Sequence, residues 1–359
     1  MALCLSLGFA SGMPLFVVLT LLGAYLRKEG VNLKEIGLFS LIMIPYTWKF
    51  VWSPLVDRYN LFHLGRRRSW MLISQIAVFF SIFLLGQFSP KTSLSVIAVV
   101  SVILSFASAT QDIVIDAYRR EILTDRELGL GTSLFITASR ASSLVPGGLS
   151  LVIAQFLSWS DVFFITAAFM LPALVVTFFI KEPETINAPR NLRQAIIEPF
   201  REFKDRRGLK SMFLIILFVF CYKLGDSMAT ALATPFYIDL HYDLLTIGLV
   251  AKNAGLWSML IGGILGGVIM LKTGINKALW YFGFGQLITI LGFVILAHEG
   301  IGSDTAPSVF LLAFVIIAEC LGAGLGTSAF VAFLSAQTNK SYAATQFALL
   351  TSLSAVPRT

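Results

Sequence analysis

Residues 94–118 read LSVIAVVSVILSFASATQDIVIDAY, an apolar run that is long enough to cross a membrane as one helix. A helix needs about 20 mainly apolar residues to span the hydrocarbon core of a bilayer. Because that core holds no water, every backbone N–H and C=O group must find its partner within the protein, which leaves helices and closed barrels. Runs of this length recur along the chain, so the sequence predicts an all-α integral membrane protein.

The composition of the whole chain supports this prediction. Of its 359 residues, 57% are hydrophobic and only 13% are charged, and its mean hydropathy is +0.82. A soluble globular domain carries about twice that share of charged residues. The predicted spans are residues 2–26, 36–53, 70–88, 94–118, 129–155, 160–180, 211–237, 246–270, 278–297 and 307–337.

The positive charges lie in alternate loops. One set of loops carries 18 Lys and Arg residues, whereas the opposite set carries only four. Because cytoplasmic loops of membrane proteins are enriched in Lys and Arg, the basic set is predicted to be cytoplasmic, together with the N-terminus. The formal net charge of +7 is thus explained by membrane topology, and nucleic acid is not an expected partner.

The chain is predicted to divide into two transmembrane halves. Residues 1–181 form an N-terminal half of six helices, residues 182–210 a cytoplasmic linker, and residues 211–359 a C-terminal half with about four and a half spans. If the architecture has twelve spans, the C-terminal half is incomplete in this chain. Residues 192–203 of the linker are amphipathic with basic neighbours, which is typical of a helix on the inner membrane surface or of a solvated linker helix.

Glycines cluster in two of the C-terminal spans. They are Gly262, Gly263, Gly266 and Gly267, and then Gly322, Gly324 and Gly326. Such spacings let helix backbones approach closely in a bilayer. Close helix packing is therefore the first interpretation, and a moving gate is the alternative.

Several ionisable residues fall inside the predicted spans, where each costs about 2.5–3.5 kcal/mol on insertion scales and marks a candidate functional site. In the fourth span, Asp112 and Asp116 are four residues apart and share a helix face, with Gln111 beside them. Asp112 is predicted to bind a proton or substrate, or else to form a buried pair with Arg140 or Lys49. Asp116 fits either a proton site or a pair with Arg119 or Arg120.

The C-terminal spans carry a second set. Lys223 and Asp226 are three residues apart and can pair on one helix. Glu319 is an acid in an apolar setting, which suits a group that takes up and releases a proton; the alternative is a neutral, hydrogen-bonded core glutamate. Asn253 is a further polar residue in the eighth span.

The loop after the second span contains an acid, a turn and a basic cluster. Asp57 and Arg58 are followed by Gly65, Arg66 and Arg67. An acid at a helix end and a neighbouring basic run can clamp helices together through charge and helix-dipole contacts. The other interpretation is the ordinary positive charge of a cytoplasmic loop.

These residues resemble the loop signature of the major facilitator superfamily, an acid and a base followed by a glycine and an Arg/Lys run. The chain departs from that signature at Ser53, where glycine is usual, and in the longer spacing to Gly65. Its longer form is similar to the AmpG-type muropeptide permeases. The motifs that carry this likeness are LGFASGMPL (7–15), PYTWKFVWSPLVDRY (45–59), LGRRRSWML (64–72), SATQDIVIDA (108–117), YKLGD (222–226), GTSAFVAFL (326–334) and ATQFALLTSLSAV (344–356).

The resemblance implies a permease of the bacterial inner membrane that imports anhydro-muropeptides (GlcNAc-anhydroMurNAc and its peptides) for peptidoglycan recycling. Protons would drive it by symport, and no cofactor is expected. Alternating access between the two halves would then expose a site near the middle of the membrane. The expected proton-coupling residues are Asp112, Glu319 and Asp116; the expected substrate-binding residues are Gln111, Arg140, Lys223, Asp226 and Asn253; the expected gating residues are Asp57, Arg58, Gly65, Arg66, Arg67 and Lys49.

Two alternatives stay open at this point. The first is a facilitator-type transporter of another organic anion or of an acyl-CoA. The second is a polytopic membrane enzyme, against which stands the absence of H-E-x-x-H and G-x-S-x-G motifs from the sequence. His63, His241 and His298 all lie in predicted loops or at their edges, so no catalytic or metal site is expected.

Overall fold

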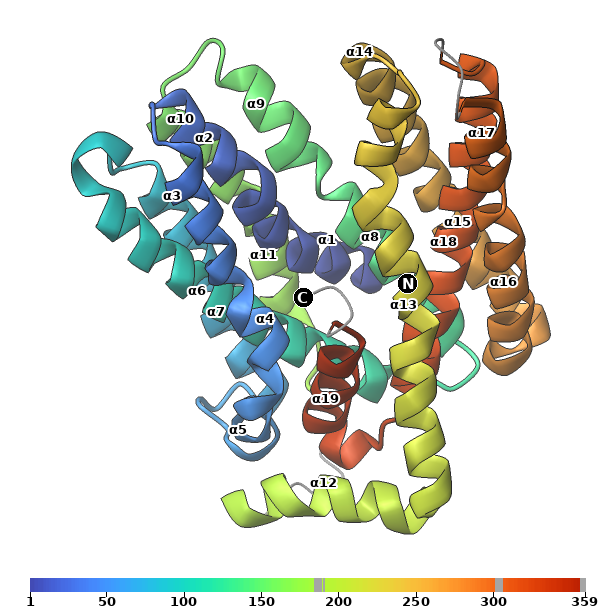
Figure 1. The fold of residues 1–359 in the computed structure, drawn as a ribbon. Coiled ribbons are helices and arrows are strands. Elements are labelled where there is room, and N and C mark those ends of the chain that lie inside the picture. The colour runs from blue at the N-terminus through green and yellow to red at the C-terminus, as the bar shows by residue number, and fades with distance from the viewer. Residues whose placement is uncertain (184–188, 190, 301–305, 356–359) are drawn as a thin grey trace. The chain divides into compact units, whose positions relative to one another are not determined.

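The computed structural model describes residues 1–183, 189, 191–300 and 306–355, without the side chains of residues 223, 226, 227, 229–231 and 244. Over this described part the chain forms helices joined by loops, with no strand (Figure 1). The prediction of an all-α protein is therefore confirmed.

Eight of the described helices are long and apolar enough to cross a membrane. They correspond to eight of the ten predicted spans. Another, α13 (Leu209–Asp239), covers the predicted seventh span, and its described apolar stretch is Leu209–Tyr222. The eight are Ala2–Lys28, Arg66–Leu85, Pro90–Ile122, Leu128–Ile153, Trp159–Phe179, Ile247–Thr273, Ile275–Gly300 and Val309–Gln337.

The predicted second span is broken into short helical pieces between Leu33 and Arg58. Two stretches have the tighter 3₁₀ geometry, and each lies near a proline. Pro45 and Pro54 lack the backbone N–H that an α-helix needs, and their rings clash with the preceding turn. The pieces are α3 (Leu33–Leu38), η2 (Phe39–Met43), α4 (Ile44–Trp48), η3 (Lys49–Val51) and α5 (Ser53–Arg58).

The helices cluster into two compact units. Unit 1 comprises Met1–Ile122, Ala138–Leu209 and Thr338–Ser352, and unit 2 comprises the other described residues. Besides the pieces just named, unit 1 contains α1 (Ala2–Phe16), η1 (Val17–Leu21), α2 (Leu22–Lys28), α6 (Arg66–Leu85), α7 (Pro90–Ile122), η4 (Val145–Leu149), α9 (Ser150–Ile153), α10 (Trp159–Ala168), α11 (Leu171–Phe179), α12 (Leu192–Arg207), η6 (Lys340–Tyr342) and most of α19 (Ala343–Ala355).

Within unit 1, α6 packs against α7, α10 and α11, and α1 packs against α7 and α11. The core between them is formed by fully buried apolar side chains such as Met13, Ile82 and Phe163. The short helix α4 contacts α7 as well. Polar side chains on α1 and α4 are thereby brought next to the acids of α7.

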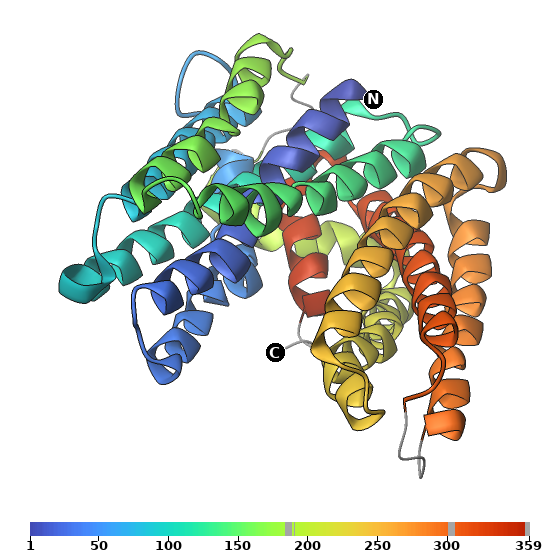
Figure 2. The same cartoon turned by 90° about the horizontal axis from the view of Figure 1, so that it is seen from above.

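In unit 2, α18 lies between α15 and α16, as the view in Figure 2 shows. The helix α8 (Leu128–Ala141) begins in this unit and ends in unit 1. The other elements are α13, α14 (Leu244–Thr246), η5 (Ile247–Lys252), α15 (Asn253–Thr273), α16 (Ile275–Ile290), α17 (Gly292–Gly300) and α18 (Val309–Gln337).

Glycines allow α15 and α18 to pack at backbone contact. A Cβ atom on Gly262 would overlap the backbone of Leu321, and one on Gly324 would lie 3.0 Å from the backbone nitrogen of Gly263. On another side of α15, the hydroxyl of Ser133 donates a hydrogen bond of 2.5 Å to the carbonyl of Gly263. The interpretation of the glycine clusters as helix-packing sites is confirmed, and a gating role stays a prediction.

Replacing Gly324 by Ala should destabilise unit 2, because the new methyl group would meet backbone atoms that cannot rotate away. Overpacking of this kind costs about 1–3 kcal/mol. The matched control is Gly285→Ala on α16, where a Cβ atom meets nothing within 4 Å. Thermal unfolding of the purified protein in detergent should show a lower Tm for Gly324→Ala and no loss for Gly285→Ala. Equal Tm values would contradict backbone contact between α15 and α18.

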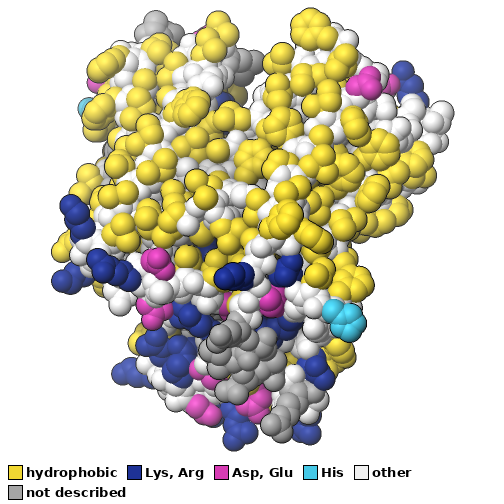
Figure 3. Space-filling view, turned by 180° about the vertical axis from the view of Figure 1, so that it is seen from behind, with side chains coloured by type: hydrophobic (Ala, Val, Ile, Leu, Met, Phe, Trp, Pro, Cys, Tyr) yellow, Lys and Arg dark blue, Asp and Glu magenta, His cyan; other side chains and the backbone are white. Residues whose placement is uncertain are grey.

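The surface of the protein matches a membrane environment. Large apolar side chains such as Phe156 and Phe310 are each 82% exposed. Figure 3 shows hydrophobic side chains over most of one face, with most Lys, Arg, Asp and Glu side chains gathered toward its lower end. Exposed apolar area of this extent is normal for a surface that faces lipid.

Candidate functional site

A polar cluster lies inside unit 1, where α1, α4 and α7 meet. The Ser11 hydroxyl on α1 donates a hydrogen bond of 2.5 Å to Oδ1 of Asp112 on α7. One turn earlier on α7, Ser108 accepts a hydrogen bond of 2.7 Å from the Tyr46 hydroxyl of α4. Ser11 and Tyr46 were not predicted as site residues, although both lie in the motifs on which the resemblance rests.

The cluster also contains a cation. Lys49 is only 7% exposed, and its ammonium group interacts electrostatically with the carboxylates of both Asp112 and Asp116. Asp116 in addition forms an ion pair of 3.0 Å with Arg119, one turn along α7. Asp116 is thus held by a structural pair, whereas the direct hydrogen bond to Asp112 comes from a neutral hydroxyl.

Gln111 is fully buried beside these acids. Neither its amide nitrogen nor its amide oxygen has a hydrogen-bond partner among the described residues. Leaving a buried polar group unsatisfied costs about 1–3 kcal/mol. Its amide is therefore suited to a polar ligand or a water molecule within the bundle.

The other predicted substrate-binding residues lie elsewhere. Arg140 is half-buried near the end of α8, in the part of that helix that belongs to unit 1. Asn253 begins α15 in unit 2 and donates a hydrogen bond of 3.4 Å to the carbonyl of Gly248. The predictions for Lys223 and Asp226 concern side chains that lie outside the described part of the structure.

Glu319 lies in unit 2, half-buried on α18. Its Oε2 atom accepts a hydrogen bond of 3.2 Å from the thiol of Cys320, and its charge interacts with the Tyr237 hydroxyl on α13. The three predicted proton-coupling residues are thus divided, with Asp112 and Asp116 in unit 1 and Glu319 in unit 2. Among the residues that the structure describes, no group of His, Cys, Asp or Glu side chains is suited to a metal ion.

A second charged cluster lies at the end of α5. Arg67 and Asp57 are both fully buried, and they form an ion pair of 2.8 Å. Arg67 also binds the carboxylate of Glu121 at the end of α7, at 2.5 Å. Arg66 donates a hydrogen bond of 2.6 Å to the backbone carbonyl of Asp57. These four side chains, called the Asp57–Arg67 cluster below, connect α5, α6 and α7.

The carboxylate of Asp57 also caps the first turn of α19. It accepts a hydrogen bond of 2.8 Å from the backbone N–H of Thr345, another of 2.7 Å from the hydroxyl of that residue, and one of 3.3 Å from the N–H of Ala344. A negative charge at a helix N-terminus is stabilised by the free N–H groups and by the helix dipole. Asp57 therefore ties α19 to the loop after the second span.

Gly65 makes this loop possible. It has a φ angle of +100°, a conformation that L-residues with side chains rarely adopt. A Cβ atom there would also overlap the side chain of Glu182, whose carboxylate accepts hydrogen bonds from the backbone N–H groups of Arg67 (2.7 Å) and Arg68 (3.0 Å). Arg58 is not part of the cluster, and its guanidinium lies 5.6 Å from the ring centroid of Tyr59.

The linker helix α12 is attached to the start of α19 by Glu202. Its carboxylate accepts hydrogen bonds of 2.9 Å from Asn339 and 2.7 Å from Gln346, and it pairs with Arg206 at 2.8 Å. Partial burial raises the pKa of Glu202, but these hydrogen bonds and the arginine outweigh it, so its pKa lies below the ordinary value of 4.5.

This arrangement predicts a pH-dependent contribution to stability. Because the folded-state pKa of Glu202 is lowered, the contribution is present above about pH 4.5 and is lost as the pH falls below that value. At neutral pH the Tm of the wild type should exceed that of Glu202→Gln, and the difference should vanish in acid. The exposed Asp205→Asn change on the same helix serves as the control. A Tm difference between the wild type and Glu202→Gln that stays constant from neutral to acid pH would show that Glu202 does not act through its charge.

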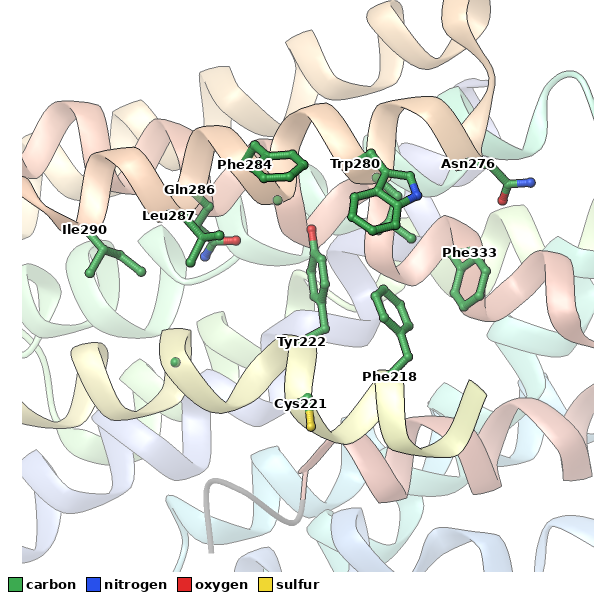
Figure 4. Close-up of a pocket in the computed structure, with 13 residues that line it drawn as sticks. Phe218, Cys221, Tyr222, Asn276, Trp280, Phe284, Gln286, Leu287, Ile290 and Phe333 are labelled. Atoms are coloured by element: carbon green, nitrogen blue, oxygen red, sulfur yellow. The ribbon is translucent and has the colours of Figure 1, made fainter. Parts of the chain in front are cut away.

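A cavity of about 550 Å³ opens in unit 2 between α13, α16 and α18 (Figure 4). Its wall is almost entirely apolar, and Trp280, Phe284 and Leu287 line it from α16. Tyr222, Asn276 and Gln286 add polar side-chain atoms, and the Tyr222 ring stacks on Phe330 with centroids 5.0 Å apart. None of the predicted site residues with a described side chain lines this cavity, and its chemistry does not suit a charged sugar-peptide.

The sequence matches the model of the Major Facilitator Superfamily over residues 4–358. The chain belongs to this superfamily. The facilitator-type fold and the all-α membrane architecture predicted from the sequence are therefore confirmed. Its members are transporters, and the chain is accordingly a multi-pass membrane protein of a transporter family.

Curated relatives cover almost the whole chain. An uncharacterized protein of Haemophilus influenzae is 46% identical over 99% of this chain and 85% of its own length. The anhydromuropeptide permease of Escherichia coli K12 is 39% identical over 99% of this chain and 72% of its own length. The predicted resemblance to AmpG-type permeases is confirmed, since proteins of Rickettsia described as putative AmpG transporters also match.

Solved structures of other facilitators share the fold. The human organic anion transporter MFSD10 superposes with a TM-score of 0.72 at 14% identity, covering 99% of this chain and 90% of its own. The proton:xylose symporter XylE has a TM-score of 0.67 at 14% identity, covering 99% and 84%. At such identities the likeness concerns the facilitator fold alone.

The cluster around Asp112 and the Asp57–Arg67 cluster differ in the chemistry that they can perform. The cluster around Asp112 combines an acid, a buried amide and a cation inside a membrane span, which can bind a proton or a polar solute. The Asp57–Arg67 cluster has its hydrogen bonds directed to backbone and side chains of neighbouring helices, which can hold them together.

Proposed function

We propose that this facilitator imports anhydro-muropeptides, namely GlcNAc-anhydroMurNAc and its peptide forms, across the bacterial inner membrane for peptidoglycan recycling. The observation that carries the proposal is 39% identity to the E. coli anhydromuropeptide permease over 99% of the chain. The matched region spans almost the whole chain, so it includes the segments that carry the Asp112 cluster and the Asp57–Arg67 cluster. In this proposal the N-terminus faces the cytoplasm, in line with the charge of the loops.

Protons supply the driving force in this proposal. Asp112 is the main proton-binding group, because it is an acid inside a span whose direct hydrogen bond comes from the neutral hydroxyl of Ser11, whereas Asp116 is paired with Arg119. A carboxylate among apolar helices changes its charge only when it takes up or releases a proton, and that proton must travel along a path that leads to water. Glu319 would act as the corresponding acid of unit 2, and Asp116, which is paired with Arg119, would support Asp112.

The substrate supplies hydroxyl groups from its sugars and carboxylates from its peptide stem. Gln111 would bond to a hydroxyl or amide, since its own amide has no partner among the described residues. Arg140 and Lys223 would bind the stem carboxylates, a task suited to cations. Asp226 and Asn253 complete the proposed substrate site.

Transport would proceed by alternating access between the half formed by residues 1–181 and the half that begins at residue 211, joined by the linker 182–210. The Asp57–Arg67 cluster would stabilise one of the two end states, because Asp57 binds the first turn of α19. Arg58, Gly65 and Lys49 belong to the same proposed gating set. Opening of the Asp57–Arg67 cluster would release α19 from α5.

Uptake by cells tests the proposed substrate. E. coli cells that lack their own anhydromuropeptide permease and express this chain should accumulate labelled GlcNAc-anhydroMurNAc above the level of cells with an empty vector. Excess unlabelled anhydro-muropeptide should compete for this uptake, whereas an acyl-CoA or an unrelated organic anion should not. Uptake equal to the empty-vector level, with the protein shown to be folded in the membrane, would overturn the muropeptide assignment.

A further inference from the structure

Ser11 on α1 donates its hydroxyl proton to a neighbouring helix and not to its own. Serine and threonine hydroxyls inside helices often donate to a carbonyl of the preceding turn, as Ser101 does to the carbonyl of Ile97 at 2.7 Å. The Ser11 hydroxyl instead donates to Oδ1 of Asp112 on α7, at 2.5 Å. A hydroxyl group carries a single proton, so the proton of Ser11 is committed to this carboxylate.

The packing of α1 holds Ser11 in this position. Its side chain is only 7% exposed. The next residue is Gly12, where a Cβ atom would overlap the backbone carbonyl of Ser139 near the end of α8. The helix α1 is therefore at backbone contact with α8 and also packs against α7. Because close-packed helices cannot slide without moving their neighbours, the hydroxyl stays within reach of Asp112.

The elements around the Ser11–Asp112 contact carry several ionisable side chains. They are Lys49 on η3, Tyr46 on α4, Asp116 and Arg119 on α7, and Arg140 near the end of α8. The buried charges of α5 and α6, and Lys340 of η6, lie instead around Glu121, about two and a half helical turns along α7 from Asp112. Residues 2–26 carry no charged side chain. All of these charges remain when Ser11 is replaced, so a substitution there isolates the effect of its hydroxyl.

We propose that Ser11 is a positioning residue of the proton site, whose hydroxyl holds the ionised carboxylate of Asp112 and so favours release of the proton. This inference rests on the proposed function, in which Asp112 carries the coupled proton. A hydrogen bond donated to a charged group favours the charged form. Loss of the hydroxyl should therefore strengthen proton binding by about tenfold, as expected for a hydrogen bond to an ionised group. Release of the proton would become harder, and each transport cycle would slow.

Carbodiimide labelling of the purified full chain tests this role without any substrate. Dicyclohexylcarbodiimide adds to a protonated carboxyl group and leaves a stable N-acylurea, which mass spectrometry locates on the peptide that contains Asp112. The half-buried position of Asp112 leaves it open to the reagent, and loss of the label in Asp112→Asn identifies it. Compared with the wild type, Ser11→Ala should be half-labelled at a proton concentration about tenfold lower. Ser11→Cys, whose thiol is a weaker donor, should lie between them.

Transport is measured separately in proteoliposomes. Ser11→Ala should accumulate labelled anhydro-muropeptide several-fold more slowly than the wild type. If the wild type moves no muropeptide, the proposed function fails, while the labelling of Asp112 still decides the role of Ser11.

Ser101→Ala is the matched control for the labelling, because it removes a hydroxyl from α7 that donates to its own helix. It should be labelled like the wild type, and unfolding transitions confirm that each variant is folded. The proposal would be overturned if the wild type and Ser11→Ala were half-labelled at the same pH, or if Ser11→Ala required more acid. Labelling of Asp112 that does not depend on pH in the wild type would overturn it as well.

Discussion

Asp112→Asn should abolish proton-driven accumulation of substrate. One charge moving through 100 mV contributes about 2.3 kcal/mol, which corresponds to about a 50-fold concentration ratio for a neutral substrate. Asparagine keeps the size of aspartate and can still accept the hydrogen bond from Ser11, but it cannot exchange a proton. The ratio of internal to external substrate should therefore fall to about 1.

Substrate exchange distinguishes a loss of proton coupling from a loss of substrate binding in Asp112→Asn. Proteoliposomes loaded with unlabelled substrate should still exchange it for labelled substrate through Asp112→Asn, because exchange needs alternating access and no net proton movement. Asp205→Asn makes the same chemical change on the exposed surface of α12 and should accumulate substrate like the wild type. Undiminished gradient-driven accumulation by Asp112→Asn would contradict the assignment of this residue.

Arg67→Ala should cause the largest loss of stability. The change removes the guanidinium that binds both Asp57 and Glu121, and it leaves two carboxylates close together without their shared cation. Removing one partner of a buried ion pair costs about 3–5 kcal/mol, mostly because the remaining charge is left uncompensated. Unfolding in detergent should show a Tm well below that of the wild type.

An exposed arginine provides the control. Arg201 on α12 pairs with Asp205 at 3.8 Å, and the two side chains are 69% and 66% exposed. Such surface pairs contribute about 0–1 kcal/mol, so Arg201→Ala should unfold near the wild-type temperature. If Arg67→Ala and Arg201→Ala unfolded at the same temperature, the Asp57–Arg67 cluster would not stabilise unit 1.

Sequence patterns were sufficient for the architecture. Apolar runs predicted the position of most spans because their length follows from bilayer thickness. Among the described residues the second predicted span differs, because Pro45 and Pro54 break it into short pieces. The glycine clusters on α15 and α18 identified a close helix contact. The cost of burying charge likewise drew attention to Asp112 before any neighbour was known.

The partners of these charged residues could not be predicted, because they are far away along the chain. Ser11 and Asp112 are 101 residues apart, and Asp57 and Thr345 are 288 apart. A serine or threonine in a span carries no signal of what it will bond, since it can also bond to its own helix. Glu202 was missed for the same reason, because its hydrogen bonds depend on how α12 docks beside α19.

Uptake of labelled anhydro-muropeptide into proteoliposomes that contain the purified chain tests the central claim most directly. With an inward proton gradient, the wild type should concentrate the label, and dissipating the gradient with a protonophore should stop net accumulation. Folding of the reconstituted protein is checked by its unfolding transition. Failure of the folded protein to move the label, with or without a gradient, would contradict the claim that this facilitator is an anhydro-muropeptide permease.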